Sequence, residues 1–255
     1  MNNKGKSIRE LMALARGQLI GRYYQAILAN GLVMAIQMLI IMLINNGVIT
    51  SVSAYLLSLG ISIVVDLLSG ALFLGQSYFN LKFVRYDKGI SLGDVFYGFK
   101  NNLDKAIYVQ MIFTFVSLVG SLPGVLVNFG IFEVPEEYFY QARILITGIQ
   151  LLVVFVARLF YGLSFYVLSD HPDYTVGEVL SESLNLMKKR KGKLFLTYLS
   201  MIPYMLLGIF ACCVGYLWFV ALEQTVLADF YIDAIGEEPA TQFTPDSDQK
   251  TDYSI

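Results

Sequence analysis

Three long stretches without a charged residue restrict the possible folds of this chain more than any other feature. Tyr23–Val65 contains 43 residues without Asp, Glu, Lys or Arg, Ala106–Phe132 contains 27, and Leu194–Leu222 contains 29. An α-helix needs about 20 mainly apolar residues to cross the hydrocarbon core of a bilayer. Each stretch is long enough for one crossing, and the first is long enough for two. The sequence therefore predicts an all-α polytopic membrane protein.

The composition excludes several other classes of protein. Of the 255 residues, 56% are hydrophobic and 15% are charged, whereas a soluble domain usually has about 25% charged residues. A soluble enzyme, a disordered chain and a secreted disulfide scaffold are therefore excluded. Cys212 and Cys213 are adjacent and cannot pair without strain. Since His171 is the only histidine and has no suitably spaced ligands beside it, we expect no metal and no cofactor.

The number of spans is predicted to be six, with five as the alternative. As one helix, the last charge-free stretch would be about 43 Å long, which exceeds a hydrocarbon core of about 30 Å. A turn near Cys213–Gly215 would divide it, and the helix after the turn would then carry Glu223 and Asp229 at an energetic cost. The predicted spans are approximately Tyr24–Ile44, Ala54–Gly75, Ala106–Ile131, Arg143–Leu168, Leu194–Ile209 and Tyr216–Ile235.

A helix-start signature, Ser/Thr-x-x-Asp/Glu, occurs three times at constant spacing. It begins at Ser7, Ser91 and Thr175, which are 84 residues apart each time. This pattern is typical of a capping box. Apolar residues follow at matching positions. For example, the fourth residue after the Ser or Thr is Leu11, Val95 or Val179.

We predict from this pattern three amphipathic interfacial helices, each followed by two spans. The chain would then be a single membrane domain, residues 1–236, built as a threefold internal repeat with units of about 7–90, 91–174 and 175–236. The alternative is that well-capped helices happen to be equally spaced.

The basic residues predict the orientation of the chain in the membrane. In the six-span arrangement 16 of the 18 Lys and Arg residues lie on one side, and only Arg143 and Arg158 do not. The positive-inside rule then puts both termini in the cytoplasm. Residues 237–255 are mainly polar and carry five acidic side chains, so we expect a disordered cytoplasmic tail.

Four of the charged residues inside the predicted spans are candidate sites: Asp66, Arg158, Glu223 and Asp229. A charge near the middle of a membrane costs about 2.5–3.5 kcal/mol, so each of them needs a reason. They are candidates to line a polar path or to bind a cation or a headgroup. In the structural alternative, Asp66 and Arg158 neutralise each other, and the acidic residues of the last span lie near an interface.

Other polar residues have more ordinary interpretations. The basic run could contact anionic lipid headgroups, worth about 1 kcal/mol per charge, or could simply determine topology; its members are Lys188, Lys189, Arg190, Lys191 and Lys193. The amides within the spans are predicted to join helices; they are Gln25, Asn30, Gln37, Gln110 and Gln150. Gly120–Gly124, which includes Pro123, could unwind or kink its helix.

No sequence motif indicates catalysis. The chain has no Ser-His-Asp order, no Gly-rich phosphate loop, no metal-spaced His/Cys set and no nucleic-acid module, so we expect neither an enzyme nor a nucleic-acid partner. We predict a non-enzymatic membrane protein that binds a membrane protein partner or lipid, a class that includes immunity and stress-response factors. The alternative is a small transporter or channel component that uses Asp66, Arg158 and Glu223. The sequence leaves the oligomeric state open.

The region from about residue 160 to 232 carries motifs of a known family. They are Leu168-Ser169-Asp170-His171-Pro172-Asp173, Ser181-Glu182-Ser183, Leu186-Met187 and Lys193-Leu194-Phe195. They resemble the Ala-Asp-Asn-Pro-Asp loop, the helix with Glu-Ser and Leu-Met, the basic turn and the apolar span of integral membrane proteins, found mainly in Gram-positive bacteria, that are classed as domain of unknown function nine-seven-five. The resemblance implies a multi-pass protein of the bacterial cell membrane and assigns no catalytic residues. His171 stands where Asn is usual, and Gly192 where an aromatic residue is common.

Overall fold

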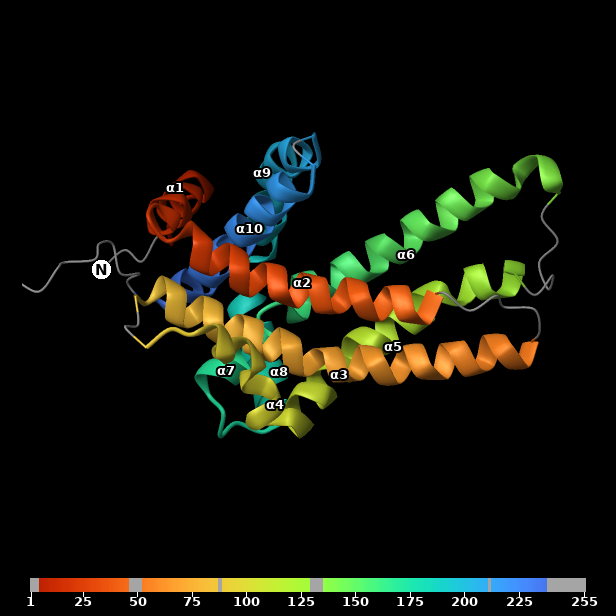
Figure 1. Ribbon diagram of the computed structural model, residues 1–255, viewed down its shortest axis with the longest axis horizontal. Helices are drawn as coiled ribbons and strands as arrows, with labels where there is room; N and C mark the ends of the chain where they lie inside the picture. Colours follow the sequence, from red (N-terminus) through yellow and green to blue (C-terminus); the bar gives the residue numbers. More distant parts are fainter. Residues whose placement is uncertain (1–4, 46–51, 87–88, 129–134, 211, 238–255) are drawn as a thin grey trace, which may run out of the picture.

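The computed structural model describes residues 5–45, 52–86, 89–128, 135–210 and 212–237, and this part of the chain is all-α (Figure 1). The α-helices are α1 (Ile8–Leu19), α2 (Tyr23–Asn45), α3 (Val52–Val84), α4 (Tyr97–Lys100), α5 (Leu103–Asn128), α6 (Phe139–Tyr161), α7 (Ser164–Asp170), α8 (Val176–Met187), α9 (Lys191–Phe210) and α10 (Cys212–Ile235). Two 3₁₀ helices, η1 (Leu92–Phe96) and η2 (Glu136–Tyr138), precede α4 and α6. The acidic tail after residue 237 lies outside the described residues.

Five segments of the described chain are long and apolar enough to cross a membrane. They are Tyr23–Met42, Leu56–Val84, Leu103–Val127, Phe139–Asp170 and Lys191–Phe210. They correspond to the first five predicted spans and suggest a multi-pass membrane protein. The helix α10, which corresponds to the sixth predicted span, is not among them.

Some helix ends differ from those predicted. The helix α3 continues nine residues beyond Gly75 to Val84, because its polar residues there, including Asn80, bond inside the bundle. Two helices, α9 and α10, share the last charge-free stretch, as predicted; α9 is described to Phe210 and α10 from Cys212. The helix α5 remains helical through Pro123, so the unwinding considered for this segment is wrong.

The six long helices pack in a closed cyclic order. Along this circle α2 contacts α3, α3 contacts α5, α5 contacts α6, α6 contacts α9, α9 contacts α10, and α10 returns to α2. The contact between α6 and α9 is the least extensive of these, and Figure 1 shows α6 leaning away from α2 and α3. The short helices α1, α4, α7 and α8 gather in the half of the molecule that holds the N-terminus (Figure 1).

Large apolar side chains cover the outside of this bundle. Phe115 of α5, Leu151 of α6 and Leu207 of α9 are each about two-thirds exposed. Soluble monomers rarely expose such a continuous apolar surface. The exposure of these side chains carries no free-energy penalty when they contact the hydrocarbon tails of lipids.

The predicted capping boxes are present at all three starts, and two of them begin α-helices. The Ser7 hydroxyl accepts from the Glu10 amide, and the Glu10 carboxylate accepts from the Ser7 amide at 2.6 Å. Thr175 and Glu178 make the same exchange at the start of α8. Such a box satisfies two amides that the first helical turn leaves without partners.

The third predicted start differs from these two. The Ser91 amide donates to the Asp94 carboxylate at 2.9 Å, but a 3₁₀ helix follows, and α4 ends at Lys100. Asn102 then adopts a positive φ of 57° before α5 begins, a conformation that Asn tolerates better than most residues. A long amphipathic helix is therefore absent between Ser91 and the next span.

Close backbone packing accounts for this difference. A Cβ on Gly75 of α3 would overlap the carbonyl oxygen of Val95, and a Cβ on Gly98 of α4 would overlap the carbonyl oxygen of Ala71. The η1–α4 segment therefore lies directly on the backbone of α3. Small residues allow such contacts between membrane helices.

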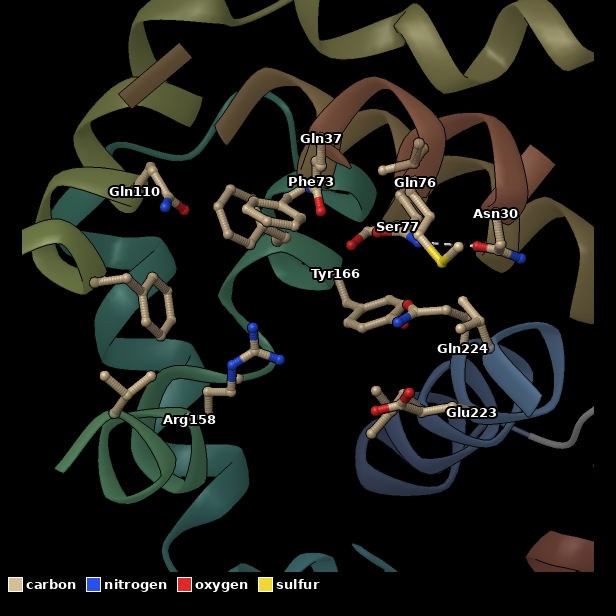
Figure 2. A pocket seen from close by; sticks show the side chains of 18 of the residues that line it. Asn30, Gln37, Phe73, Gln76, Ser77, Gln110, Arg158, Tyr166, Glu223 and Gln224 are labelled. Atoms are coloured by element: carbon tan, nitrogen blue, oxygen red, sulfur yellow. Dashed lines mark hydrogen bonds between the residues drawn. The ribbon is translucent and has the colours of Figure 1, made fainter. Parts of the chain in front are cut away.

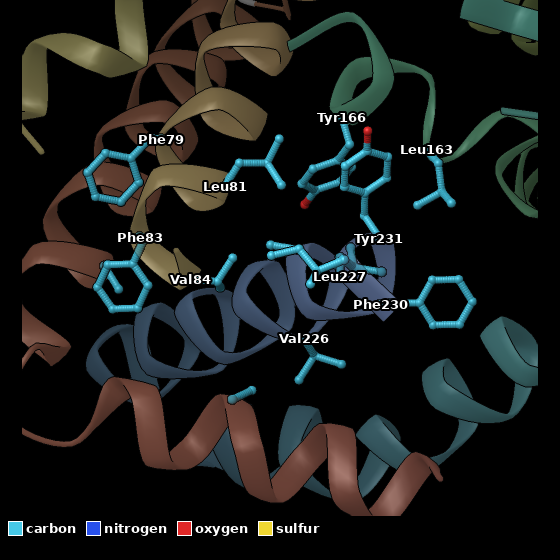
Figure 3. Packing of buried hydrophobic residues seen from close by; sticks show 14 of the residues in the cluster. Phe79, Leu81, Phe83, Val84, Leu163, Tyr166, Val226, Leu227, Phe230 and Tyr231 are labelled. Carbon is cyan, nitrogen blue, oxygen red and sulfur yellow. The ribbon is translucent and has the colours of Figure 1, made fainter. Parts of the chain in front are cut away.

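The apolar core lies between α3, α7 and α10 (Figure 3). Phe79 and Phe83 of α3, Tyr166 of α7, and Phe230 and Tyr231 of α10 are at most 4% exposed. The rings of Tyr166 and Tyr231 stack with centroids 5.7 Å apart. This core holds the half of the bundle nearest the N-terminus and positions the residues of the cavity described next.

Candidate functional site

A cavity of about 420 Å³ lies among the long helices (Figure 2). Side chains from α2, α3, α5, α6, α7, α9 and α10 line it. Its volume falls within the roughly 300–1,000 Å³ typical of small-molecule pockets. Its polar lining comprises Asn30, Gln37, Asp66, Gln76, Ser77, Gln110, Ser117, Arg158, Tyr166, Tyr198, Tyr216, Glu223 and Gln224.

Three of the four charged residues singled out in the predicted spans line this one cavity. They are Asp66 from α3, Arg158 from α6 and Glu223 from α10. Asp229, the fourth, is fully buried elsewhere, where its Oδ1 accepts from Gln18 of α1 at 3.1 Å. The structure thus brings together three charges that are separated by more than 60 residues along the chain.

Asp66 is bonded to α5. Gln110 donates to its Oδ1 at 3.3 Å, and the Thr114 hydroxyl donates to its Oδ2. These bonds place an acidic side chain inside the bundle with partners for both oxygens. Among the described residues Asp66 makes no ion pair with Arg158, so the mutual neutralisation considered for the two is absent.

Arg158 and Glu223 extend into the cavity from different helices (Figure 2). The Arg158 guanidinium lies within the electrostatic reach of both Tyr198 and Glu223. No ion pair joins Arg158 to Glu223 in the described part of the chain. Opposite charges attract strongly in a site with little water. Because these two side chains do not contact each other, each can still bind an oppositely charged group of a ligand.

Amide side chains connect α2 to α3 beside the cavity. Asn30 accepts from Gln76 and from Asn80, each at 3.0 Å, and donates to Asn80 at 3.2 Å. Asn30 and Asn80 are at most 1% exposed. The prediction that amides join helices is confirmed for Asn30 and for Gln110, and such bonds are worth about 0.6–2 kcal/mol each in membrane proteins.

The members of the basic run around the start of α9 differ in their surroundings. Lys193 pairs with Asp233 of α10 at 2.6 Å, and the Lys191 ammonium lies 3.3 Å from the centroid of the Phe160 ring. Lys188 and Lys189 are exposed. Contact of this run with anionic lipid stays a prediction, and the two exposed lysines are its best-placed members.

A charged cluster at the ends of three helices was not anticipated from the sequence. Arg85, just after α3, donates to both oxygens of Asp170 at 2.7 and 3.0 Å and to Glu237 at 2.6 Å. The Tyr231 hydroxyl donates to Asp170 at 3.1 Å. The bonds to Asp170 raise the pKa of Arg85 above its ordinary value. Asp170 is the first acidic residue of the loop motif quoted above, which gives that residue a structural role.

The face periodicity of the cavity residues was not predicted from the sequence either. Asp66, Phe73 and Ser77 are spaced by seven and four residues, which places them on one face of α3. Asn30 and Gln37 have the same spacing of seven on α2. The signal in the sequence is the helical spacing of polar residues within the apolar runs, which marks the cavity-facing sides of α2 and α3.

The described residues contain no group of three or more His, Cys, Asp and Glu side chains that could hold a metal ion. The carboxylates, amides and guanidinium of the cavity are suited to binding a polar organic ligand through hydrogen bonds and charge.

These features define an all-α protein with several candidate membrane helices around a charged cavity. Residues 1–237 match the family model described as Protein of unknown function (DUF975), and the chain belongs to that family. The resemblance inferred from the loop and helix motifs is thereby confirmed over nearly the whole chain. No curated protein and no solved structure matches the chain.

Proposed function

We propose that α10 is a sixth span and that the chain is a threefold repeat of paired spans. The cyclic order of the helices supports this, since it consists of three successive pairs, α2–α3, α5–α6 and α9–α10. Equivalent residues support it too. Leu11, Val95 and Val179, each four residues after a cap, are all 0% exposed.

The orientation proposed is that both termini face the cytoplasm of a bacterial cell. The capped segments lie in the half of the molecule that holds the N-terminus (Figure 1), and most Lys and Arg residues belong to these segments or adjoin them. The positive-inside rule supports this orientation.

We propose that the protein is a non-enzymatic membrane protein whose cavity binds and transports a small polar solute. The observation that supports this is the convergence of Asp66, Arg158 and Glu223, from three helices, on one cavity. Intramembrane charges are costly and commonly mark substrate paths. Binding of a partner protein or of lipid at the surface would not account for charges kept inside the bundle.

Access of water to the cavity gives the first test. In a chain with Cys212 and Cys213 replaced by Ser, Ser77→Cys should react with a charged, membrane-impermeant methanethiosulfonate. Ser69→Cys is the matched control, because Ser69 is similarly buried on α3 but is not among the cavity-lining residues. Equal protection of both cysteines would show a sealed interior and overturn the proposal.

Transport gives the second test. Vesicles containing the purified chain are incubated with a low-molecular-weight bacterial cytosolic extract, and their contents are measured by mass spectrometry. We expect at least one solute to accumulate with the unmodified chain and not with Asp66→Asn or Arg158→Met. If the contents match those of empty vesicles, the chain does not transport.

A further inference from the structure

The cavity contains an acidic side chain, Glu223, and a basic one, Arg158, that form no ion pair with each other in the described part of the chain; the Arg158 guanidinium lies beside the Tyr198 side chain. Asp66 already has two hydrogen-bond donors. In contrast, no described residue hydrogen-bonds to the Glu223 carboxylate, and Arg158 is not joined to it by an ion pair. Leaving two opposite charges apart in a low-dielectric site is unfavourable unless a third group bridges them.

A bridging group must carry both signs of charge. A carboxylate matches the planar guanidinium of Arg158, to which it can bind through two parallel hydrogen bonds. An ammonium matches the carboxylate of Glu223. A simple cation would be attracted by Glu223 but repelled by Arg158. A simple anion would be attracted by Arg158 but repelled by Glu223.

Further groups in the cavity lack partners. Tyr166 is 4% exposed and its hydroxyl has no hydrogen-bond partner among the described residues. The side-chain nitrogen of Gln37 is likewise buried without an acceptor. Buried polar atoms without partners are unfavourable, so a polar ligand that bonds to them gains affinity.

One wall of the cavity is aromatic. The Phe165 ring lies 5.8 Å from the Phe73 ring and 6.2 Å from the Phe113 ring, measured between centroids, and all three residues line the cavity. Such a wall provides apolar contact for a side chain next to the charged groups.

We propose that the cavity binds an amino-acid-sized zwitterion with an apolar side chain, its carboxylate on Arg158 and its ammonium on Glu223. This inference rests on the proposed function, because it names the class of solute for the same cavity.

Binding to the purified full chain tests the inference. The twenty standard amino acids are tested singly by thermal stabilisation, which grows with ligand concentration relative to Kd. Apolar amino acids should stabilise the chain. For phenylalanine, the matched probes are phenethylamine, which lacks the carboxylate, and 3-phenylpropionate, which lacks the ammonium. Each analogue should bind at least tenfold more weakly than phenylalanine.

Variants assign each charge to its side chain. Glu223→Gln should weaken phenylalanine binding at least tenfold and leave the weak binding of 3-phenylpropionate unchanged or improved. Arg158→Met should also weaken phenylalanine binding at least tenfold, but should leave the weak binding of phenethylamine unchanged or improved. Asp229→Asn is the control on the same helix, outside the cavity, and should leave phenylalanine affinity unchanged. If Glu223→Gln does not fold, Glu223→Asp keeps the charge and should retain binding.

Each contrary result is decisive. Equal binding of phenethylamine and phenylalanine would make this a cation site, and equal binding of 3-phenylpropionate an anion site; either overturns the inference. It is also possible to separate the two proposals. If Ser77→Cys reacts and a solute from the extract accumulates, but no amino acid stabilises the chain, then the proposal of a zwitterion site is wrong and the transport proposal stands.

Discussion

Charged side chains in this chain have two kinds of surroundings. Arg85 and Asp170 satisfy each other through two hydrogen bonds at helix ends, whereas Arg158 and Glu223 face a cavity from separate helices. The first arrangement fixes the packing of helices. The second keeps charge available, which is the arrangement expected of a binding site.

The ion pair of Asp170 should contribute measurably to stability. Replacing Asp170 by Asn removes the charge that Arg85 contacts, and hydrogen bonds to charged groups are worth about 1.5–3 kcal/mol. We expect a loss of about that size in the free energy of unfolding, measured by denaturant titration in detergent. Asp173→Asn in the same loop, at an exposed position, is the control. Equal losses in the two variants would contradict the role given to Arg85.

The helix cap at Thr175 should weaken in acid. The Thr175 amide bonds to the Glu178 carboxylate and lowers the pKa of Glu178 below its ordinary value of 4.5. Because the folded pKa is the lower one, the cap stabilises α8 fully above the unfolded pKa and loses this effect as pH falls through the folded pKa. The protection of amides in the first turn of α8, taken relative to their intrinsic exchange rates, should therefore decrease as the pH falls through the folded pKa of Glu178.

The matched variant for this effect is Glu178→Gln. A Gln side chain can still accept from the Thr175 amide but does not titrate. The protection of amides in the first turn of α8, relative to their intrinsic exchange rates, should then no longer depend on pH in this range. An unchanged dependence in the variant would assign the effect to another group.

At the scale of elements, two glycines account for the departure of the η1–α4 segment from the other two capped helices. Gly75 and Gly98 let backbone contact backbone, and the segment shortens to fit against α3. The capping motif at Ser91 was visible in the sequence. The contact that overrides it was not, because it depends on residues about 20 positions away on another helix.

Gly75→Ala should destabilise the chain strongly. The added methyl group would overlap the Val95 carbonyl, and overpacking of this kind costs about 1–3 kcal/mol or more. Gly60→Ala on the same helix is the control, since a Cβ there meets nothing within 4 Å. Thermal unfolding in detergent should separate the two variants. A Gly75→Ala chain as stable as Gly60→Ala would mean that η1 does not lie on α3 as described.

At the scale of the whole molecule, hydropathy alone predicts five of the long helices and their approximate ends. Hydropathy also predicts that α3 ends at Gly75, because the residues that follow include the polar residues Gln76 and Asn80. Those amides are buried against Asn30 of α2, a pairing that local sequence does not reveal. Likewise, Asp66, Arg158 and Glu223 stood out as charges, but their meeting in one cavity depends on how the helices close into a circle.

The parity of the spans is testable with reporters fused to each end of the chain. If α10 crosses the membrane, the N- and C-terminal fusions lie on the same side, and green fluorescent protein at either end should fluoresce in the cytoplasm. Alkaline phosphatase at either end should then be inactive. An active phosphatase at the C-terminus would give five spans and contradict the threefold repeat.

The contact between α1 and α10 affects how the chain can be synthesised. Gln18 bonds to Asp229, 211 residues later, and the Lys6 amide bonds to Asp233 at 2.7 Å. The ribosome releases α1 long before α10 has been synthesised, so α1 can form these contacts only after α10 has been made. A chain truncated before α10 would leave Arg85 without its Glu237 contact and α1 undocked. The docking of α1 therefore depends on the synthesis of α10.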